Sequence, residues 1–167
     1  MNLAHSLQRI ALADPQRPAI FEGERLLHTY GQWAERAARL AACFAAHGLQ
    51  PGDRVALFMR NHPAYLDILY GAWWAGLAVV PINAKLHLKE VQWIAENAAA
   101  RRAFVTSDIV PDPAELTGLD GVMDVDSAEC DAWVTEGVGL SEIEDRAPGD
   151  TAWLFYTSGT TGRPKGV

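Results

Sequence analysis

The sequence is poor in cysteine, has no excess of basic charge and contains no long unbroken apolar run. Its two cysteines, Cys43 and Cys130, fit no CxxC or Cys/His spacing, so neither a disulfide framework nor a zinc site is indicated, and a reducing cytoplasm is the expected compartment. Lysine and arginine total 14 against 21 aspartates and glutamates, and this net charge of −7 argues against a nucleic-acid-binding surface. The most apolar stretch, residues 65–83, is interrupted by an aspartate, two glycines and a proline, so no membrane span is expected there.

What the sequence does contain is the composition of an ordinary globular domain. Its 167 residues are 49% hydrophobic and 21% charged, without a repeat, a low-complexity tract or a visible domain boundary. Helical periodicity alternates with short apolar runs along the chain. This alternation predicts an α/β fold with a mostly parallel, doubly wound sheet and flanking helices.

Local signals give the expected elements. The stretch from Thr29 to Gln32 has the form of a capping box, which predicts that a long helix follows it, and Asn61 is expected to cap the next helix. Helices are expected over residues 3–13, 30–47, 62–75, 87–99 and 127–136. A hairpin is expected over residues 19–30, and strands over residues 55–59, 77–82, 102–107, 121–126 and 151–158.

The stretch with the most distinctive chemistry is YTSGTTGRPKGV, Tyr156 to Val167. Its glycines let the backbone approach an anion, its hydroxyls supply short donors, and Lys165 supplies a positive charge. These are properties of a polyphosphate-binding loop, although the composition alone is equally compatible with a flexible polar terminus and a solvated lysine. The spacing GxxxxGK[ST] fails around Lys165 and the spacing GxSxG fails around Ser158, which excludes two common alternatives.

Other residues that often carry chemistry form no comparable pattern. The five histidines contain no HxxxH pair and no acidic run matches an EF-hand loop, so the histidines are interpreted as surface or cap residues. Trp73 and Trp74 could line an acyl pocket, but tryptophans on a helix between strands are more often core residues. We therefore assign both to the core.

The stretch TAWLFYTSGTTGRPKGV strongly resembles the phosphate-binding signature of the adenylate-forming enzymes, the superfamily of acyl-CoA synthetases, luciferases and peptide-synthetase adenylation domains. The stretches LQPGDRVALFMRNHPAYL and LYGAWWAGLAVVPINAKLHLKEV are similar to other parts of that family. The resemblance implies that residues 1–167 are the N-terminal part of a larger AMP-binding (adenylation) domain and end in its phosphate-binding loop. The later acidic Mg²⁺ motif, the hinge and the C-terminal domain would then be absent from this chain.

The resemblance also implies a two-step reaction, in which ATP activates a carboxylic acid to an acyl-adenylate and CoA then takes the acyl group. Lys165 would be catalytic because it neutralises phosphate charge, and the Thr157 hydroxyl would lie near Mg²⁺. Carried over by position, the residues that would bind the ATP phosphates are Thr157, Ser158, Gly159, Thr160, Thr161, Gly162 and Lys165.

Three hypotheses remain open at this point. The first is an acid–CoA ligase, because Pro81-Ile82-Asn83 is more similar to the acyl-CoA synthetase branch; a fatty or medium-chain acid is the first expectation and an aryl acid the second. In that case the chain alone is expected to be inactive and the loop from about Gly159 to be mobile. The second is a stand-alone, non-catalytic α/β module that binds a nucleotide or a partner. The third is self-association of the chain through an exposed sheet edge.

Overall fold

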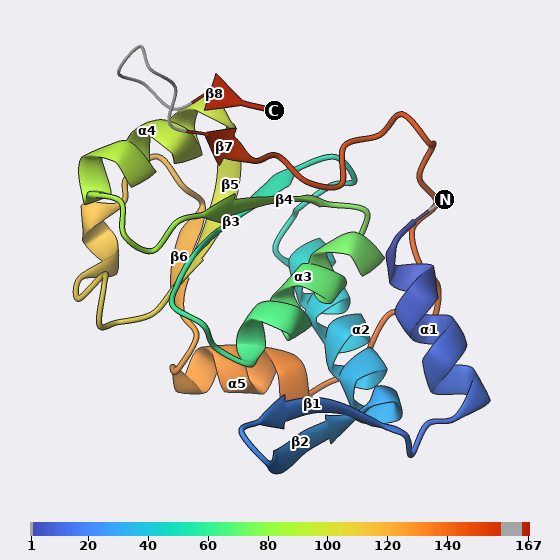
Figure 1. Cartoon of the computed structure of the whole chain (residues 1–167). Helices are drawn as coiled ribbons and strands as arrows, with labels where there is room; N and C mark the ends of the chain where they lie inside the picture. Colours follow the sequence, from blue (N-terminus) through green and yellow to red (C-terminus); the bar gives the residue numbers. More distant parts are fainter. Residues whose placement is uncertain (1, 158–164) are drawn as a thin grey trace.

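The computed structural model describes residues 2–157 and 165–167 and shows an α/β fold. At its centre is a four-stranded parallel sheet with the strand order β4-β3-β5-β6 (Figure 1). Its strands are β3 (Arg54–Phe58), β4 (Ala78–Ile82), β5 (Ala100–Val105) and β6 (Gly121–Asp124). The predicted parallel α/β architecture is confirmed.

Helices cover both faces of this sheet (Figure 1). One face carries α2 (Tyr30–Ala46), α3 (Ala64–Trp74) and α5 (Ala128–Thr135), with α1 (Ala4–Ala13) packed on the outside; the other carries α4 (Leu88–Asn97) and the 3₁₀ turn η1 (Pro113–Glu115). Alternate residues of β3 serve the two layers, since Val55 and Leu57 join the core with α2 and α3 while Ala56 and Phe58 join the core with α4. A strand buried on both sides explains the continuous apolar run.

The start of α2 confirms the predicted capping box. The Thr29 hydroxyl accepts a hydrogen bond from Gln32 N, and the Gln32 side chain accepts one from Thr29 N at 2.9 Å. The prediction that Asn61 caps the next helix is wrong. Because α3 begins at Ala64, Asn61 lies too far upstream, and Ala64 N instead donates to His62 Nδ1 at 3.1 Å. The predicted hairpin forms from β1 (Pro18–Glu22) and β2 (Arg25–Thr29).

The strand predicted over residues 151–158 is not one strand. Its first part pairs in parallel with the edge of β4, where Val79 N donates to Ala152 O at 3.0 Å and Leu154 N donates to Val79 O at 2.9 Å. At Phe155 the chain changes partner and bonds with Val167. The two-residue strands β7 (Tyr156–Thr157) and β8 (Lys165–Gly166) then pair antiparallel beside α4 (Figure 1).

Candidate functional site

The two described ends of the predicted phosphate loop lie side by side. In the ribbon formed by β7 and β8, Thr157 is directly opposite Lys165, and both side chains are exposed. Directly opposite residues of an antiparallel pair share one face, with Cβ atoms about 4.5–5.5 Å apart. The structure thus places the Thr157 and Lys165 side chains on the same face of the ribbon.

The other predicted loop residues, and with them the expected mobility of the loop, lie outside the described residues: Ser158, Gly159, Thr160, Thr161 and Gly162.

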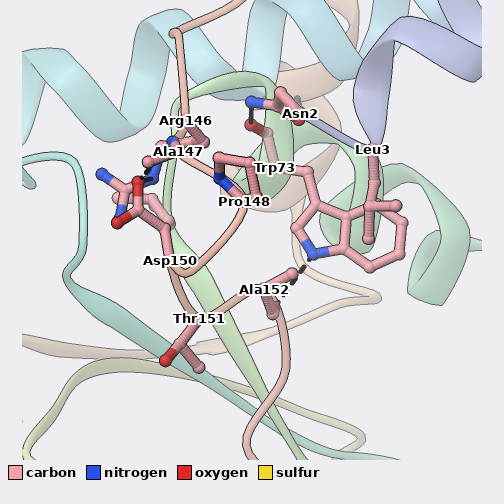
Figure 2. Close-up of a pocket in the computed structure, with 11 residues that line it drawn as sticks. Asn2, Leu3, Trp73, Arg146, Ala147, Pro148, Asp150, Thr151 and Ala152 are labelled. Atoms are coloured by element: carbon pink, nitrogen blue, oxygen red, sulfur yellow. Dashed lines mark hydrogen bonds and ion pairs between the residues drawn. The ribbon is translucent and has the colours of Figure 1, made fainter.

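Upstream, the ribbon is tied to the end of α3. The Trp73 indole nitrogen donates to Ala152 O at 3.0 Å, and the Trp73 and Trp153 rings pack edge to face with centroids 4.5 Å apart. Figure 2 shows the Trp73 indole pointing at Ala152, and both residues line a small pocket. The volume of this pocket is about 180 Å³. Asn2 also lines this pocket, and its Nδ2 donates to Trp73 O and to Glu144 O. The assignment of Trp73 to the core is confirmed, since its side chain is buried.

Trp74 is likewise buried, as expected, and its indole nitrogen donates to Glu142 O at 3.1 Å. Of the histidines, His62 and His87 act at helix starts, as the cap interpretation predicts. His62 Nδ1 accepts from Ala64 N, and His87 forms a capping box with Glu90.

Beyond the contacts with Trp73, the ribbon packs against α4. The Tyr156 hydroxyl donates to Asn97 Oδ1 at 2.7 Å, and the Tyr156 ring meets the Trp93 ring edge to face with centroids 6.1 Å apart. The Tyr156 hydroxyl is a donor at neutral pH because the ordinary tyrosine pKa is about 10, and partial burial raises the pKa of Tyr156 further. Sequence analysis did not identify Asn97 or Trp93 as functional, because both lie within an expected helix and match no motif.

A second hollow lies at the carboxyl ends of β3 and β4. The chain leaves β3 towards one face of the sheet and leaves β4 towards the other, which is the topology that opens a ligand crevice in doubly wound folds. The groove has a volume of about 630 Å³ and is lined in part by Arg60, Asn61, Asn83 and Lys85. Arg60 also pairs with Asp108. Because Asp108 compensates the charge of Arg60, Lys85 and the two amides are the groups that favour an anionic ligand. Sequence reasoning missed this groove, although polar residues directly after two apolar strands were a usable signal.

A buried ion pair joins α2 to α3. Arg36 Nε donates to Asp67 Oδ2 at 2.8 Å, and the Asp67 side chain is only 1% exposed. Burial raises the pKa of the Asp67 carboxyl, while Arg36, His28 and His62 act in the opposite direction. Among the described residues, Asp67 Oδ1 has no hydrogen-bond partner.

Over residues 2–157 and 165–167, no cluster of three histidine, cysteine, aspartate or glutamate side chains could hold a metal ion. Both cysteines are free thiols. No helix in the same residues is long and apolar enough to span a membrane.

Comparisons with known proteins agree on one family. The family described as "AMP-binding enzyme" matches residues 7–167. Feruloyl-CoA synthase from an Amycolatopsis species is 37% identical over 159 residues, which cover 95% of this chain and 31% of that protein. Long-chain-fatty-acid–CoA ligase FadD13 from Mycobacterium tuberculosis is 30% identical over 182 residues, which cover 99% of this chain and 34% of that protein. The chain therefore spans about a third of the length of these two relatives.

The solved structures show the same likeness in three dimensions. The structure of a fatty acyl CoA synthetase from Mycobacterium tuberculosis superimposes with a TM-score of 0.83 at 27% identity. The superposition covers 99% of this chain and 34% of that one.

Proposed function

This chain belongs to the AMP-binding enzyme family, and we propose that the protein activates a carboxylic acid with ATP and then transfers the acyl group to CoA. The observation that carries the proposal is the direct opposition of Thr157 and Lys165 in a chain that matches the family almost throughout. The named relatives are acid–CoA ligases, which supports this reaction class. Because the chain spans about a third of their length, the proposal concerns the full-length protein, and the remaining parts of the site would lie elsewhere in it.

In the first step, a carboxylate oxygen attacks the α-phosphorus of ATP and the bond from that phosphorus to the bridging oxygen of pyrophosphate breaks. Negative charge grows on the departing pyrophosphate. We assign to Lys165 the neutralisation of this charge and to the Thr157 hydroxyl a hydrogen bond to a phosphate oxygen, because both groups are exposed on one face of the ribbon. The proposed phosphate ligands Ser158, Gly159, Thr160, Thr161 and Gly162 would complete the loop.

Mg²⁺ fits this arrangement only if Thr157 shares its coordination with groups outside the described residues. The ion prefers oxygen ligands, and the exposed Thr157 hydroxyl is one such group. The described residues supply no further cluster for it, so phosphate oxygens and residues elsewhere in the protein would complete the coordination. When bound, Mg²⁺ would add positive charge beside the phosphates.

For the second step, we assign the groove at the carboxyl ends of β3 and β4 to the phosphate-bearing part of CoA. Lys85 supplies its positive charge, while Arg60 lies in the same groove paired with Asp108. The acid itself is proposed to be a fatty or medium-chain acid, with an aryl acid as the second choice. The named relatives include one enzyme of each kind.

The test is carboxylate-dependent ATP–pyrophosphate exchange by the full-length protein, run with a panel of medium-chain, long-chain and aryl acids. We expect exchange with at least one acid, and we expect Lys165→Ala to slow it at least about tenfold, the effect of losing roughly 1.4 kcal/mol of transition-state stabilisation. Lys89→Ala is the matched control, since Lys89 is an exposed lysine on α4. Unchanged exchange in Lys165→Ala would remove Lys165 from the mechanism, and a wild type inactive with every acid would refute the proposed reaction.

A further inference from the structure

We propose that Tyr156 is a positioning residue for the phosphate loop, and that Asn97 holds it in place. Tyr156 directly precedes Thr157, and its strand partner Gly166 directly follows Lys165. Its side chain therefore sets the relative position of the two loop ends. This inference rests on the proposed function, because it assigns a role within the same phosphate site.

The first step of the argument is that the ribbon needs external support. Its strands β7 and β8 contain two residues each, and an isolated two-stranded ribbon is marginally stable in water. Two further backbone bonds extend it, from Phe155 N to Val167 O at 3.1 Å and from Val167 N to Phe155 O at 2.8 Å. Contacts outside the ribbon must therefore fix its position.

The second step is that Tyr156 connects the ribbon to a rigid element. The hydroxyl donates to Asn97 Oδ1 at 2.7 Å, across 59 residues of sequence, and the ring packs edge to face on Trp93. Both partners belong to α4, which packs through Ile94 and Ala95 into the core on that face of the sheet. A site supported by a packed helix is held more precisely than one supported by a loop.

The third step is that the same ring also contacts the opposite strand. A Cβ added to Gly166 would lie 3.2 Å from Tyr156 Cζ and 3.4 Å from the Tyr156 hydroxyl oxygen, so the ring lies against the glycine backbone. An aromatic ring that covers a cross-strand glycine is a known device for fixing strand register. The Tyr156 side chain thus connects its own strand β7 with α4 and β8, and in this way it positions Thr157 and Lys165.

The experiment uses Tyr156→Phe, which removes the hydroxyl and keeps the ring, and Asn97→Leu, which removes the acceptor at similar size. Asn97→Asp keeps an acceptor oxygen and is the conservative rescue. Tyr70→Phe is the matched control, a tyrosine packed against the core. The first readout is hydrogen exchange at the amides of Phe155 and Val167, and the second is the KM for ATP and the kcat of pyrophosphate exchange, both measured on the full-length protein.

We expect both disruptive variants to speed amide exchange at these two positions and to raise the KM for ATP about fivefold, the factor that one hydrogen bond of ordinary strength supplies. The kcat should change less than the KM, because the phosphates are held before and during the chemical step. Asn97→Asp and Tyr70→Phe should behave like the wild type.

The outcomes separate cleanly. Unchanged amide exchange in Tyr156→Phe and Asn97→Leu would overturn the anchor itself. Faster amide exchange with unchanged KM and kcat would overturn the positioning role and leave Tyr156 a structural contact. A wild-type protein without pyrophosphate-exchange activity would refute the proposed function and, with it, the role assigned to Tyr156. The amide hydrogen-exchange measurement would still show whether Asn97 holds Tyr156.

Discussion

The buried pair between Arg36 and Asp67 gives the sharpest prediction about stability. Their side chains are 20% and 1% exposed, and Arg36 supplies the hydrogen bond to the Asp67 carboxylate. Replacing Arg36 with methionine keeps an apolar stem but leaves a buried carboxylate without its partner. We expect the free energy of unfolding at pH 8 to fall by about 3–5 kcal/mol, the usual cost of breaking one side of a buried pair. A loss of that size is a large part of the stability of a typical domain.

The sign of the pH dependence follows from the pKa of Asp67. Burial already raises this pKa, and Arg36 is the strongest influence that lowers it, so Arg36→Met raises the folded-state pKa further. Above pH 3.8, the ordinary pKa of an aspartate, the unfolded chain releases the Asp67 proton, whereas the folded variant keeps it. Stability should therefore be lost as pH rises from that value through the raised folded pKa, and the deficit should be smaller at pH 5 than at pH 8.

The assay is urea unfolding followed by tryptophan fluorescence at the two pH values. His28 and His62 also act on the same carboxylate, so the double variant Arg36→Met/Asp67→Asn isolates the contribution of Asp67 and should recover most of the loss. Arg25→Met is the control, because the pair of Arg25 with Glu22 is 70% and 58% exposed and should contribute less than about 1 kcal/mol. A loss below about 1 kcal/mol in Arg36→Met, or an equal loss at both pH values, would refute the reasoning.

Two further predictions concern the groove and the cysteines. Lys85→Ala should raise the KM for CoA in thioester formation, because a cation leaves the proposed CoA groove. Pyrophosphate exchange without CoA is the reference reaction, and an unchanged KM for CoA would remove Lys85 from that site. Burial raises the pKa of the Cys130 thiol to about 12, so iodoacetamide at pH 8 should label Cys130 at least about tenfold more slowly than the half-buried Cys43. Peptide mapping measures both rates, and equal labelling would show that α5 opens readily.

Much of the fold could be predicted from local sequence. The capping box at Thr29 marks the start of α2, and the run of apolar residues in β3 indicates a strand covered on both faces. The split of residues 151–158 could not be predicted, because the same alternating residues suit pairing with β4 and pairing with β8. Only tertiary contacts decide where the chain changes partner. In the sequence, Asp67 only interrupts an apolar stretch. Its ion pair could not be predicted, because its partner Arg36 lies on another helix.

For the candidate site too, the sequence predicts the residues but not their arrangement. Thr157 and Lys165 were identified from the residue types of the loop and from its resemblance to the phosphate-binding signature, but their direct opposition depends on a register that the sequence does not display. That register is held by contacts with α3, β4 and α4, through Trp73, Val79 and Asn97. In the sequence these three elements follow one another, and their residues carry the ordinary patterns of core helices and strands. Because a two-residue ribbon cannot fix its own position, the geometry of the proposed phosphate site must depend on this framework as much as on the loop.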